Sequence, residues 1–573
     1  MKKIFNYMLM TALAALTISC QGLKSEEGET GKAEPGVQGV FYADIPGDKE
    51  IVEIAPGANR SYTLKACAFQ GNVTDIAMNF SFKADADAVE KYNQANGTSY
   101  VMCPGSAYEF VTNDVLLPRY GKASTTAKLK VIASGLEQDV TYILPVTLDK
   151  AKQTESWSVA DTLAAYVIFK QSAYDPNGPG TVNNPYPIST VADLKDIDSK
   201  TMEGLTVYFR LENDIDLSGE ADWKGLNSAP YKQFSLDGAG HTISNMTGGT
   251  GLFESVVGEV HDLKISNAKI TVASGLPAGI LACYSGSTET STTIKNVYVD
   301  GKLVNQKAHG TGGIIGVTQN TTIDACSANV TIQSTKYDSG GIVGYDNSNA
   351  EKAQKSVISN CWTSGDISGN RMVGGIVGML KAECSVINCY STAEVHAQFQ
   401  YGGIVGNAIM GDKSGNEDKD PKIRVEKCLA WNKSVYTDNN DESVHYSSGA
   451  VVGFTALKNY HVDCYRRADL IFKECNANSM NVLVDQENSS PDNPLVEVAV
   501  STGSTNYNFP YHGKTAAEGA TASEVAKKLG WSESIWDLSG NLPFFKGGDA
   551  PVVISDDEAN GQLPDFDENE FYN

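Results

Sequence analysis

A short glycine-framed motif recurs along the second half of the chain, and it constrains the fold more than any other feature. The pattern Gly-Gly-Ile-Val-Gly occupies residues 340–344, 374–378 and 402–406, and residues 312–316 carry it with Ile at the fourth place. The four copies start 28, 34 and 28 residues apart. Such self-similarity at a period of about 30 residues predicts a solenoid in which each repeat is one structural unit.

A second apolar unit lies halfway between the copies of this motif and ends in cysteine each time. Its copies span residues 323–326, 358–361, 386–389, 425–428 and 472–475. Two short apolar strands per period, with no helix-forming run between them, predict one coil of a parallel β-helix. Coils would stack about 4.8 Å apart and share a core. Glycines are expected at corners that need positive φ or close backbone approach. An array of β-sandwiches is the alternative, but identical strand motifs would not recur so tightly there.

Five cysteines share one position of this repeat, which predicts an inward-facing column: Cys326, Cys361, Cys389, Cys428 and Cys475. A free cysteine packs like a small apolar residue, and Val297 holds the same position in an earlier coil. Disulfides are the alternative, although in-register strands rarely direct two Cβ atoms suitably. We predict no metal site, because the chain has no Cys-x-x-Cys and its His residues do not cluster near the column.

The residue after each column position should point away from the coil, because strand side chains alternate. We call four aromatic residues on this outward line the aromatic strip: Tyr298, Trp362, Tyr390 and Trp431. Sugar rings stack on such aromatic surfaces, so the strip is predicted to bind glycans. The alternative is that a loop or the N-terminal domain covers it. Further aromatics, predicted to lie in insertions at a groove edge, are Phe399, Tyr401, Tyr436 and Tyr446.

The N-terminal part of the chain predicts a separate β-rich domain over residues 36–172. Alternating runs such as 127–131 and 142–146 are separated by turn-forming residues. One amphipathic helix is expected from about Ala86 to Ala95, ending at Asn96-Gly97. Many short strands with turns at these intervals predict an immunoglobulin-like β-sandwich.

Both parts resemble known families. Tyr92-Asn93, Asn96-Gly97, Leu117-Pro118 and residues 142–146 resemble a domain of unknown function that begins many Bacteroidetes surface lipoproteins, including glycan-binding proteins and some glycosidases. Residues 213–217, 234–243 and 251–253 resemble the opening of GLUG-motif β-helices of bacterial surface proteins and adhesins, and residues 530–543 resemble their end. The second resemblance covers roughly 185–548 and implies a right-handed parallel β-helix, without implying an activity.

The first residues resemble a bacterial lipoprotein export signal. Lys2 and Lys3 precede an apolar run over 4–16 that is too short to span a membrane permanently. The run ends in Leu-Thr-Ile-Ser-Cys, which resembles a lipobox and predicts lipidation of Cys20. The acidic pair Glu26-Glu27 resembles the tag that sends such lipoproteins to the outer face of the cell. The expected order is therefore signal peptide 1–20, tether 21–35, sandwich domain 36–172, linker 173–184, β-helix 185–548 and acidic tail 549–573.

The net charge restricts the class of partner. Lys and Arg number 45 against 69 Asp and Glu, a formal charge of −24. Nucleic-acid binding relies on cationic patches, so no nucleic-acid partner is expected. Anionic lipid surfaces are disfavoured for the same reason, which leaves the acyl group as the expected membrane link and favours neutral ligands.

A search for catalytic arrangements gives no recognisable motif. The chain has no Gly-x-Ser-x-Gly elbow and no His-Glu-x-x-His. Acidic residues that could serve a glycosidase are ascribed to solvated loops: Asp324, Asp346, Asp366 and Glu394. The run 438–441 could hold Ca²⁺, but an exposed turn is favoured.

These observations predict a non-catalytic, outer-surface glycan-binding lipoprotein of a starch-utilisation-like uptake system. It would need no cofactor or metal and would pass polysaccharide to an outer-membrane transporter. A β-helix polysaccharide lyase or glycoside hydrolase is the first alternative, because fold does not determine function. A cell-surface adhesin is the second.

Overall fold

The computed structural model describes residues 40–548 with gaps, and the chain divides into two compact units. The gaps are 46–48, 55–57, 70–75, 134–135, 138–139, 150–156, 161–163, 172–177, 203, 228–231, 273–274, 350–351, 409–421, 440–447, 457–458, 474–482, 491 and 494–507. One unit comprises residues 1–176 with 202–205, and the other comprises 177–201 with 206–573. The predictions for Cys20, the tether, the acidic tail, Tyr446 and Cys475 lie outside the described residues.

The first unit is built from two five-stranded sheets. One has the order β11-β1-β3-β9-β7, with β1 (Val40–Asp44), β3 (Asn59–Ala68), β7 (Tyr108–Thr112), β9 (Ala127–Ile132) and β11 (Ser158–Val159). The other has the order β2-β12-β10-β5, and β6 also pairs with β10; its strands are β2 (Ile51–Ile54), β5 (Phe82–Ala84), β6 (Val101–Met102), β10 (Thr141–Leu148) and β12 (Ala165–Gln171). A small pair joins β4 (Met78–Phe80) to β8 (Val115–Leu117).

Alternating burial explains why these strands form a sandwich. In β9 every second residue is buried, and Leu129 and Val131 contribute to the same core as Leu144 and Phe169 of the other sheet. A one-turn 3-10 helix, η2 (Gly105–Ala107), lies between β6 and β7. The predicted helix is confirmed as α1 (Asp87–Asn96), which ends where Gly97 adopts a left-handed conformation with φ of 65°.

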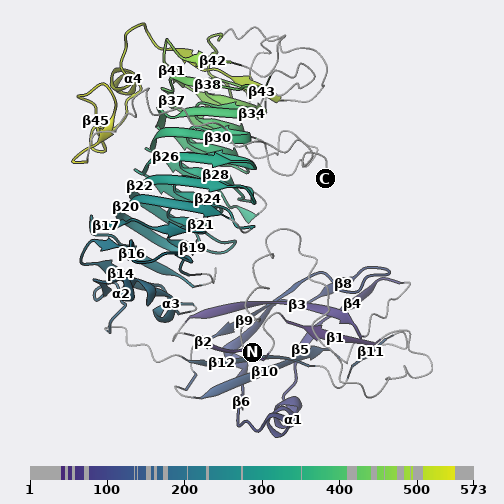
Figure 1. Ribbon diagram of the computed structural model, residues 1–573. Coiled ribbons are helices and arrows are strands. Elements are labelled where there is room, and N and C mark those ends of the chain that lie inside the picture. The colour runs from purple at the N-terminus through teal and green to yellow at the C-terminus, as the bar shows by residue number, and fades with distance from the viewer. Residues whose placement is uncertain are drawn as a thin grey trace. The chain divides into compact units, whose positions relative to one another are not determined.

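The second unit contains a 24-stranded sheet and an eight-stranded sheet (Figure 1). The strands of the larger sheet are β13 (Tyr186–Ile188), β14 (Val207–Leu211), β15 (Ile215–Asp216), β16 (Phe234–Asp237), β17 (Thr242–Ser244), β18 (Thr247–Gly248), β20 (Gly258–Val272), β22 (Thr292–Asn305), β23 (Thr311–Gly312), β25 (Thr321–Asp324), β26 (Ser327–Ser334), β27 (Tyr337–Gly340), β29 (Val357–Ser359), β30 (Trp362–Gly374), β32 (Ser385–Ile387), β33 (Tyr390–Ser391), β34 (Glu394–Gly402), β36 (Arg424–Glu426), β37 (Leu429–Ala430), β38 (Ser434–Tyr436), β40 (Tyr460–Val462), β41 (Tyr465–Arg466), β42 (Ile471–Phe472) and β44 (Lys514–Thr515).

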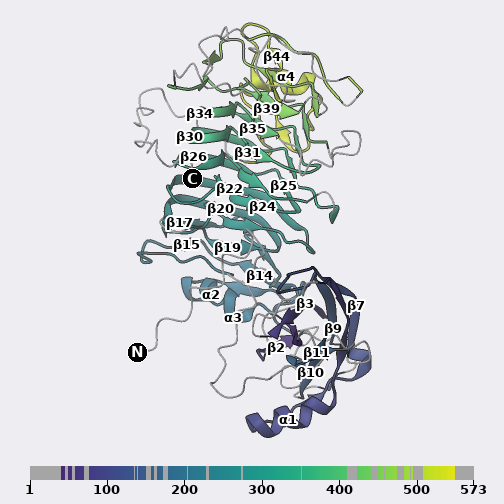
Figure 2. The same cartoon turned by 90° about the vertical axis from the view of Figure 1, so that its right-hand side faces the viewer.

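The eight-stranded sheet is formed by the strands that begin in the glycine-framed motif and their equivalents. They are β19 (Phe253–Val256), β21 (Ala282–Ser285), β24 (Ile315–Thr318), β28 (Val343–Asp346), β31 (Val377–Leu380), β35 (Val405–Ala408), β39 (Val452–Ala456) and β43 (Asn508–Tyr511). Every pairing in it is parallel except the last, where β43 runs antiparallel to β39. Figure 2 shows β31 and β35 stacked above β24.

Few helices accompany these strands. The second unit has α2 (Val191–Lys195), α3 (Ile197–Lys200) and α4 (Ala522–Lys528), and its last strands are β45 (Trp536–Asp537) and β46 (Phe544–Phe545). In the part of the chain that the structure describes, no helix combines the length and apolar character needed to cross a membrane. The predicted all-β class is confirmed, and the long parallel sheet fits a β-helix.

The register between coils follows the sequence repeat. The second repeat unit aligns Ile323 with Ile358 and Ile358 with Val386, while the glycine-framed motif aligns Val343 with Val377 and Val377 with Val405. All of these side chains are fully buried. Each apolar column therefore runs from coil to coil and forms the shared core that a solenoid requires.

The residue next to the cysteine column in each coil has a left-handed backbone conformation. This position is held by Asn, Asp, Lys or Ala, and not by the paired glycines of the motif. The residue just before each column position has φ between 51° and 54°, and these residues are Asp262, Asn296, Ala325, Asn360, Asn388, Lys427 and Asp463. The motif glycines are needed for close approach instead. A Cβ on Gly341 would lie 2.3 Å from the Gly375 carbonyl oxygen and 2.5 Å from Thr363 Cγ2.

The cysteine column is present, but its last member differs from the prediction. Cys326, Cys361, Cys389 and Cys428 are fully buried, unbonded thiols. The next member is Cys464, because Val425 pairs with His461, which lies three residues before it. The assignment of Phe472 to this unit was wrong, because Phe472 pairs with Val435 in a different part of the coil.

Candidate functional site

The aromatic strip lies beneath the C-terminal segment of the chain. Trp362 and Tyr390 are register partners with ring centroids 6.2 Å apart, as the repeat predicts. They belong to a buried cluster with Leu429, Trp431 and C-terminal residues Ala516, Ala522, Val525, Ala526, Leu529, Trp531, Trp536 and Leu538. Figure 1 shows α4 and β45 beside β37 and β41. The alternative prediction, that another part of the chain covers the aromatic strip, therefore holds for Trp362, Tyr390 and Trp431.

Burial prevents most of the strip from acting as an open glycan platform. The exposed fractions are 4% for Trp362, 0% for Tyr390 and 8% for Trp431, while Tyr298 is half-buried. The Tyr390 hydroxyl donates a hydrogen bond to the Pro543 carbonyl oxygen, and burial raises its pKa well above the ordinary value. The cover is the C-terminal segment that includes residues 516–538, which is neither a loop between coils nor the N-terminal domain.

A second group of polar and aromatic side chains lies on the outer face of β30, β34 and β38. Asp366 pairs in register with Glu394, and His396 pairs in register with Tyr436. Because Ile367 and Val395 point into the core, the alternating Asp366, Glu394 and His396 point outward. We call these four residues the acidic–aromatic face.

The prediction that solvated loops hold the four acidic residues was wrong. Asp324, Asp346, Asp366 and Glu394 all lie within strands. Asp346 is fully buried and accepts hydrogen bonds from Thr318, Ser348 and Cys384, while burial raises its pKa.

The prediction for the additional aromatics also needs correction. Phe399, Tyr401 and Tyr436 lie in strands rather than in insertions. Tyr401 is fully buried and donates to the Lys473 carbonyl oxygen, so it cannot line a groove edge. Phe399 and Tyr436 are both half-buried, and Tyr436 belongs to the acidic–aromatic face.

The titratable groups of this face have altered pKa values. Burial, with the adjacent Glu394 carboxylate, raises the pKa of Asp366 to about 6. Burial also raises the pKa of Tyr436 to about 12, and Asp366, Glu394 and Asp438 add to that rise. For His396, burial lowers the pKa, which keeps the imidazole neutral, and the effect is opposed by Asp438.

His396 is held firmly within this face. Its ring lies 4.4 Å from the Tyr436 ring at an interplanar angle of 8°. Its side chain is 8% exposed, and its Nε2 atom lies 3.2 Å from an Asp438 carboxylate oxygen, an ion-pair distance without hydrogen-bond alignment. Asp438, which the sequence assigned to an exposed turn, is itself largely exposed.

Arg371 and its neighbours form a separate group further along the same strands. Tyr337, Arg371 and Phe399 are register partners on three successive coils. The Arg371 guanidinium lies 5.8 Å from the Tyr337 ring centroid, and its Nε donates to Gln400 Oε1 at 2.8 Å. The acidic–aromatic face therefore combines an aromatic ring, two carboxylates and a neutral imidazole on neighbouring strands, while Arg371 lies five residues along β30 from Asp366.

The sequence contains a signal for this face that the initial interpretation missed. Asp366 and Glu394 each lie five residues after a column cysteine, Cys361 and Cys389. Equal offsets from register partners predict neighbouring positions in adjacent coils, and the structure pairs the two residues.

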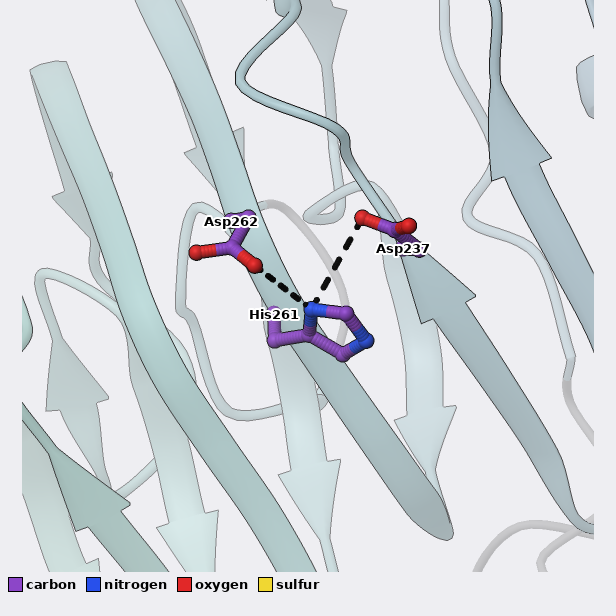
Figure 3. A group of neighbouring side chains, drawn as sticks. All are labelled: Asp237, His261 and Asp262. Carbon is purple, nitrogen blue, oxygen red and sulfur yellow. Dashed lines mark hydrogen bonds and ion pairs between the residues drawn. The ribbon is translucent and has the colours of Figure 1, made fainter.

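Among the described residues, one group brings three potential metal ligands together: Asp237, His261 and Asp262. His261 Nδ1 lies 2.9 Å from an Asp262 oxygen and 3.7 Å from an Asp237 oxygen (Figure 3). Arg210 already pairs with Asp237 at 3.2 Å, and Asn296 donates to Asp262. These carboxylates are therefore satisfied by side chains of the adjacent coils, and the group forms part of a charge ladder along the β-helix.

Comparisons with known proteins give partial matches. A family model described as a "-like, N-terminal domain" matches residues 44–155. Halomucin of Haloquadratum walsbyi is 32% identical over 174 residues, which are 27% of this chain and 2% of halomucin. The chain thus spans a very small fraction of that curated relative.

Two solved structures from Bacteroides ovatus are similar to parts of the chain. One is provisionally described as an immunoglobulin A1 protease and is 22% identical to this chain. The match covers 65% of this chain and 94% of the chain in that structure, with a TM-score of 0.43. The other is provisionally described as a carbohydrate-binding protein; it is 16% identical, covers 22% of this chain and 37% of its own, and has a TM-score of 0.19.

Proposed function

We propose that this protein binds glycans at a bacterial cell surface and that the acidic–aromatic face is its binding site. The observation that carries the proposal is the stacked pair of His396 and Tyr436 beside the register partners Asp366 and Glu394 on neighbouring strands. Sugar C–H faces stack on aromatic rings, while carboxylates accept hydrogen bonds from hydroxyls. The proposed site thus differs from the aromatic strip, most of which is covered.

The cellular setting is part of the same proposal. Lipidation of Cys20 would anchor the protein to the outer membrane, facing outward, and a neighbouring transporter of a starch-utilisation-like system would receive the glycan. The immunoglobulin-like character of the first unit would make it a spacer, and the β-helix would be right-handed and GLUG-like. Support comes from the export-signal pattern and from the sequence resemblances described above.

The test is a binding comparison between matched variants. The full mature chain is titrated calorimetrically with maltoheptaose, cellohexaose, xylohexaose and mannohexaose. We expect one of these to bind, and Tyr436→Ala to weaken it at least tenfold. Tyr345→Ala is the control, because Tyr345 is a half-buried ring on the eight-stranded sheet. No binding, or equal losses in both variants, would refute the proposed site; binding of a host protein instead would favour an adhesin.

A further inference from the structure

We infer that the second unit binds a Ca²⁺ ion between α3 and β19, where Asp198, Asn227 and Glu254 supply side-chain oxygens. All three residues belong to the same compact unit. Both Figure 1 and Figure 2 show α3 below β19, at the start of the stacked coils. The inference goes beyond the proposed function and does not depend on it, because the acidic–aromatic face lies on other strands.

Glu254 departs from the repeat at a position where later coils have glycine. The register of β19, β21, β24 and β28 places it in line with Gly316 and Gly344. A Cβ on Gly344 would lie 2.3 Å from the Thr311 backbone nitrogen, so that coil has no room for a side chain. In the first coil, Gly225 makes the room, because a Cβ there would lie 2.9 Å from Glu254 Cγ. The chain therefore accommodates a carboxylate at a position that the later coils close.

Buried oxygens without a hydrogen-bond donor surround this position. Asn227 lies beside Glu254, because the residues before them, Leu226 and Phe253, form a parallel bridge. Glu254 Oε2, Asn227 Oδ1 and Ser255 Oγ are buried and have no hydrogen-bond partner among the described residues.

Asn227 gives this observation its direction. The residue is 2% exposed, and its Nδ2 donates to the Ser255 carbonyl oxygen at 3.1 Å, which fixes the orientation of the amide and leaves Oδ1 to accept. A buried polar atom without a hydrogen bond is uncommon and needs an explanation. Because the unpartnered atoms are oxygens, the missing partner is one that accepts their electron pairs, as a metal cation does.

Asp198 brings a second carboxylate to the same place. Its Oδ1 accepts a hydrogen bond from the Asn227 backbone N–H, which holds α3 against this coil. Burial raises the pKa of Glu254, and the Asp198 charge raises it further, so the two carboxylates lie close enough to repel each other. The Lys232 ammonium donates to the Asp198 backbone carbonyl oxygen at 3.2 Å, and among the described residues no cationic side chain forms an ion pair with either carboxylate.

This set of oxygens matches the ligands of Ca²⁺. The ion takes roughly 6–8 oxygens from carboxylates, amide carbonyls, backbone carbonyls and waters in a flexible arrangement, whereas Mg²⁺ demands near-ideal octahedral geometry. Two carboxylates balance the charge of the ion, the Asn227 carbonyl oxygen gains its missing partner, and waters would fill the remaining positions. The bound ion would fasten α3 to β19, the first strand of the eight-stranded sheet.

The experiment titrates the full mature chain, stripped of metal with EDTA, with calcium chloride in a calorimeter. We expect Ca²⁺ to bind and to raise the midpoint of thermal unfolding. Glu254→Gln and Asp198→Asn should each weaken binding at least about tenfold. Asp196→Asn is the matched control, because Asp196 is an exposed carboxylate directly before α3 that pairs with Lys200, and it should bind Ca²⁺ as the wild type does.

The metal-free protein separates ion binding from a purely structural role. Without Ca²⁺, Glu254→Gln removes the repulsion with Asp198, so its unfolding midpoint should equal or exceed that of the wild type. With saturating Ca²⁺ the order should reverse. A carboxylate that only supports the fold would give a less stable variant under both conditions, and that result would overturn the inference. Circular dichroism shows whether each variant folds.

A spectroscopic signal locates the ion. Tyr284 is the register partner of Ser255, next to Glu254. Tb³⁺ in place of Ca²⁺ should therefore emit when tyrosine is excited, and Tyr284→Phe should lower this emission while Ca²⁺ still raises the unfolding midpoint.

Three results would contradict the inference. The wild type could fail to bind Ca²⁺, or binding could survive in both Glu254→Gln and Asp198→Asn, which would place the ion elsewhere. Equal stabilisation by Mg²⁺ would overturn the choice of Ca²⁺. Loss of Ca²⁺ binding in these variants with unchanged oligosaccharide titrations would support the inference and leave the proposed function to its own test.

Discussion

At the scale of single residues, Asp366 and Glu394 show how one sheet position can create two environments. The two side chains are register partners, yet burial and the neighbouring charge act on Asp366 strongly enough to raise its pKa to about 6. A carboxyl group that stays protonated when the chain folds makes stability depend on pH.

Asp366→Asn should change that dependence. The folded pKa of Asp366 is raised, so its contribution to stability is complete below the unfolded value near 4 and is lost as pH rises through about 6. We expect the wild type to lose roughly 1–2 kcal/mol between pH 4 and pH 7 from this group, after allowance for solvent screening. The Asp366→Asn variant should lack this loss of stability between pH 4 and pH 7.

Urea unfolding at several pH values measures the effect. Glu394 is the charged group that acts on Asp366, and Tyr436 lies near both carboxylates. Both groups remain in the variant. Glu426→Gln serves as the control and should keep the wild-type pH profile. If the stability of the wild type and of Asp366→Asn changed equally with pH, the raised pKa assigned to Asp366 would be contradicted.

The column cysteines illustrate what sequence can predict about residues. Four of the five were correct, because a small apolar side chain recurs at one offset from the neighbouring Ile or Val. Cys464 was missed because coil lengths vary, and spacing alone cannot decide between Cys464 and Cys475. Pairing of Val425 with His461 decides it, and that pairing depends on the length of each insertion.

These thiols should be unreactive in the folded protein. Burial raises the pKa of Cys361, Cys428 and Cys464 well above the ordinary value. Burial also acts on Cys389, but hydrogen bonds with Cys361 and Cys428 lower its pKa to about 5. All of these thiols are fully buried, so the reagent cannot reach them in the folded protein. We expect negligible modification of these cysteines by Ellman's reagent without denaturant and complete modification in 6 M guanidinium. Ser532→Cys, at an exposed position, is the control and should react within minutes. Fast labelling of the column in native buffer would show that the coils open.

At the scale of elements, each coil is shaped by two kinds of turn. Left-handed corners are occupied mainly by Asn and Asp, which tolerate positive φ better than other non-glycine residues. Stacked amides also link coils, since Asn388 Nδ2 donates to Asn360 Oδ1 at 3.4 Å and Asn360 Nδ2 donates to Asp324 Oδ1 at 2.8 Å. The sequence predicted corners but assigned them to glycine, because glycine is the commonest solution for both positive φ and close packing.

Gly341→Ala should therefore be costly although its φ is ordinary. The added methyl group would lie against the Gly375 carbonyl oxygen and Thr363, which belong to the packed core of the coil. Overpacking of this kind costs about 1–3 kcal/mol, and we expect a lower midpoint of thermal unfolding. Gly219→Ala is the matched control, since nothing lies within 4 Å of its added Cβ. An unchanged midpoint for Gly341→Ala would show that the backbone can move apart.

The sequence predicted where the C-terminal segment lies along the chain, but it did not predict what this segment packs against. Residues 530–543 were identified as an ending by resemblance, whereas their packing on the aromatic strip depends on a chain reversal that periodicity cannot predict. Trp531 and Trp536 lie against Tyr390, with ring centroids 6.3 and 5.9 Å away. Alternation predicted that the strip points away from the coil, but it left open whether the strip binds glycans or is covered by another part of the chain.

At the scale of the whole chain, the C-terminal segment should determine whether solvent reaches the aromatic strip. Trp536 is 1% exposed, and Trp536→Ala removes a large buried ring at a cost of about 3–5 kcal/mol. We expect the segment to loosen and the dye ANS to bind the uncovered strip. Lys527→Ala, an exposed change on the same segment, is the control and should leave ANS fluorescence unchanged. Absence of ANS binding by Trp536→Ala would mean that the segment holds without this ring.

The reversed strand β43 has a consequence for how these chains behave when crowded. A stack of parallel strands presents an open edge that a second copy could extend, and repeated extension would produce fibres. Because β43 runs antiparallel to β39, a second copy that kept the direction of the stack would meet β43 in antiparallel rather than parallel pairing. The reversed strand thus breaks the coil-to-coil repeat at this edge, whereas the larger sheet still ends in the parallel pair of β41 and β44.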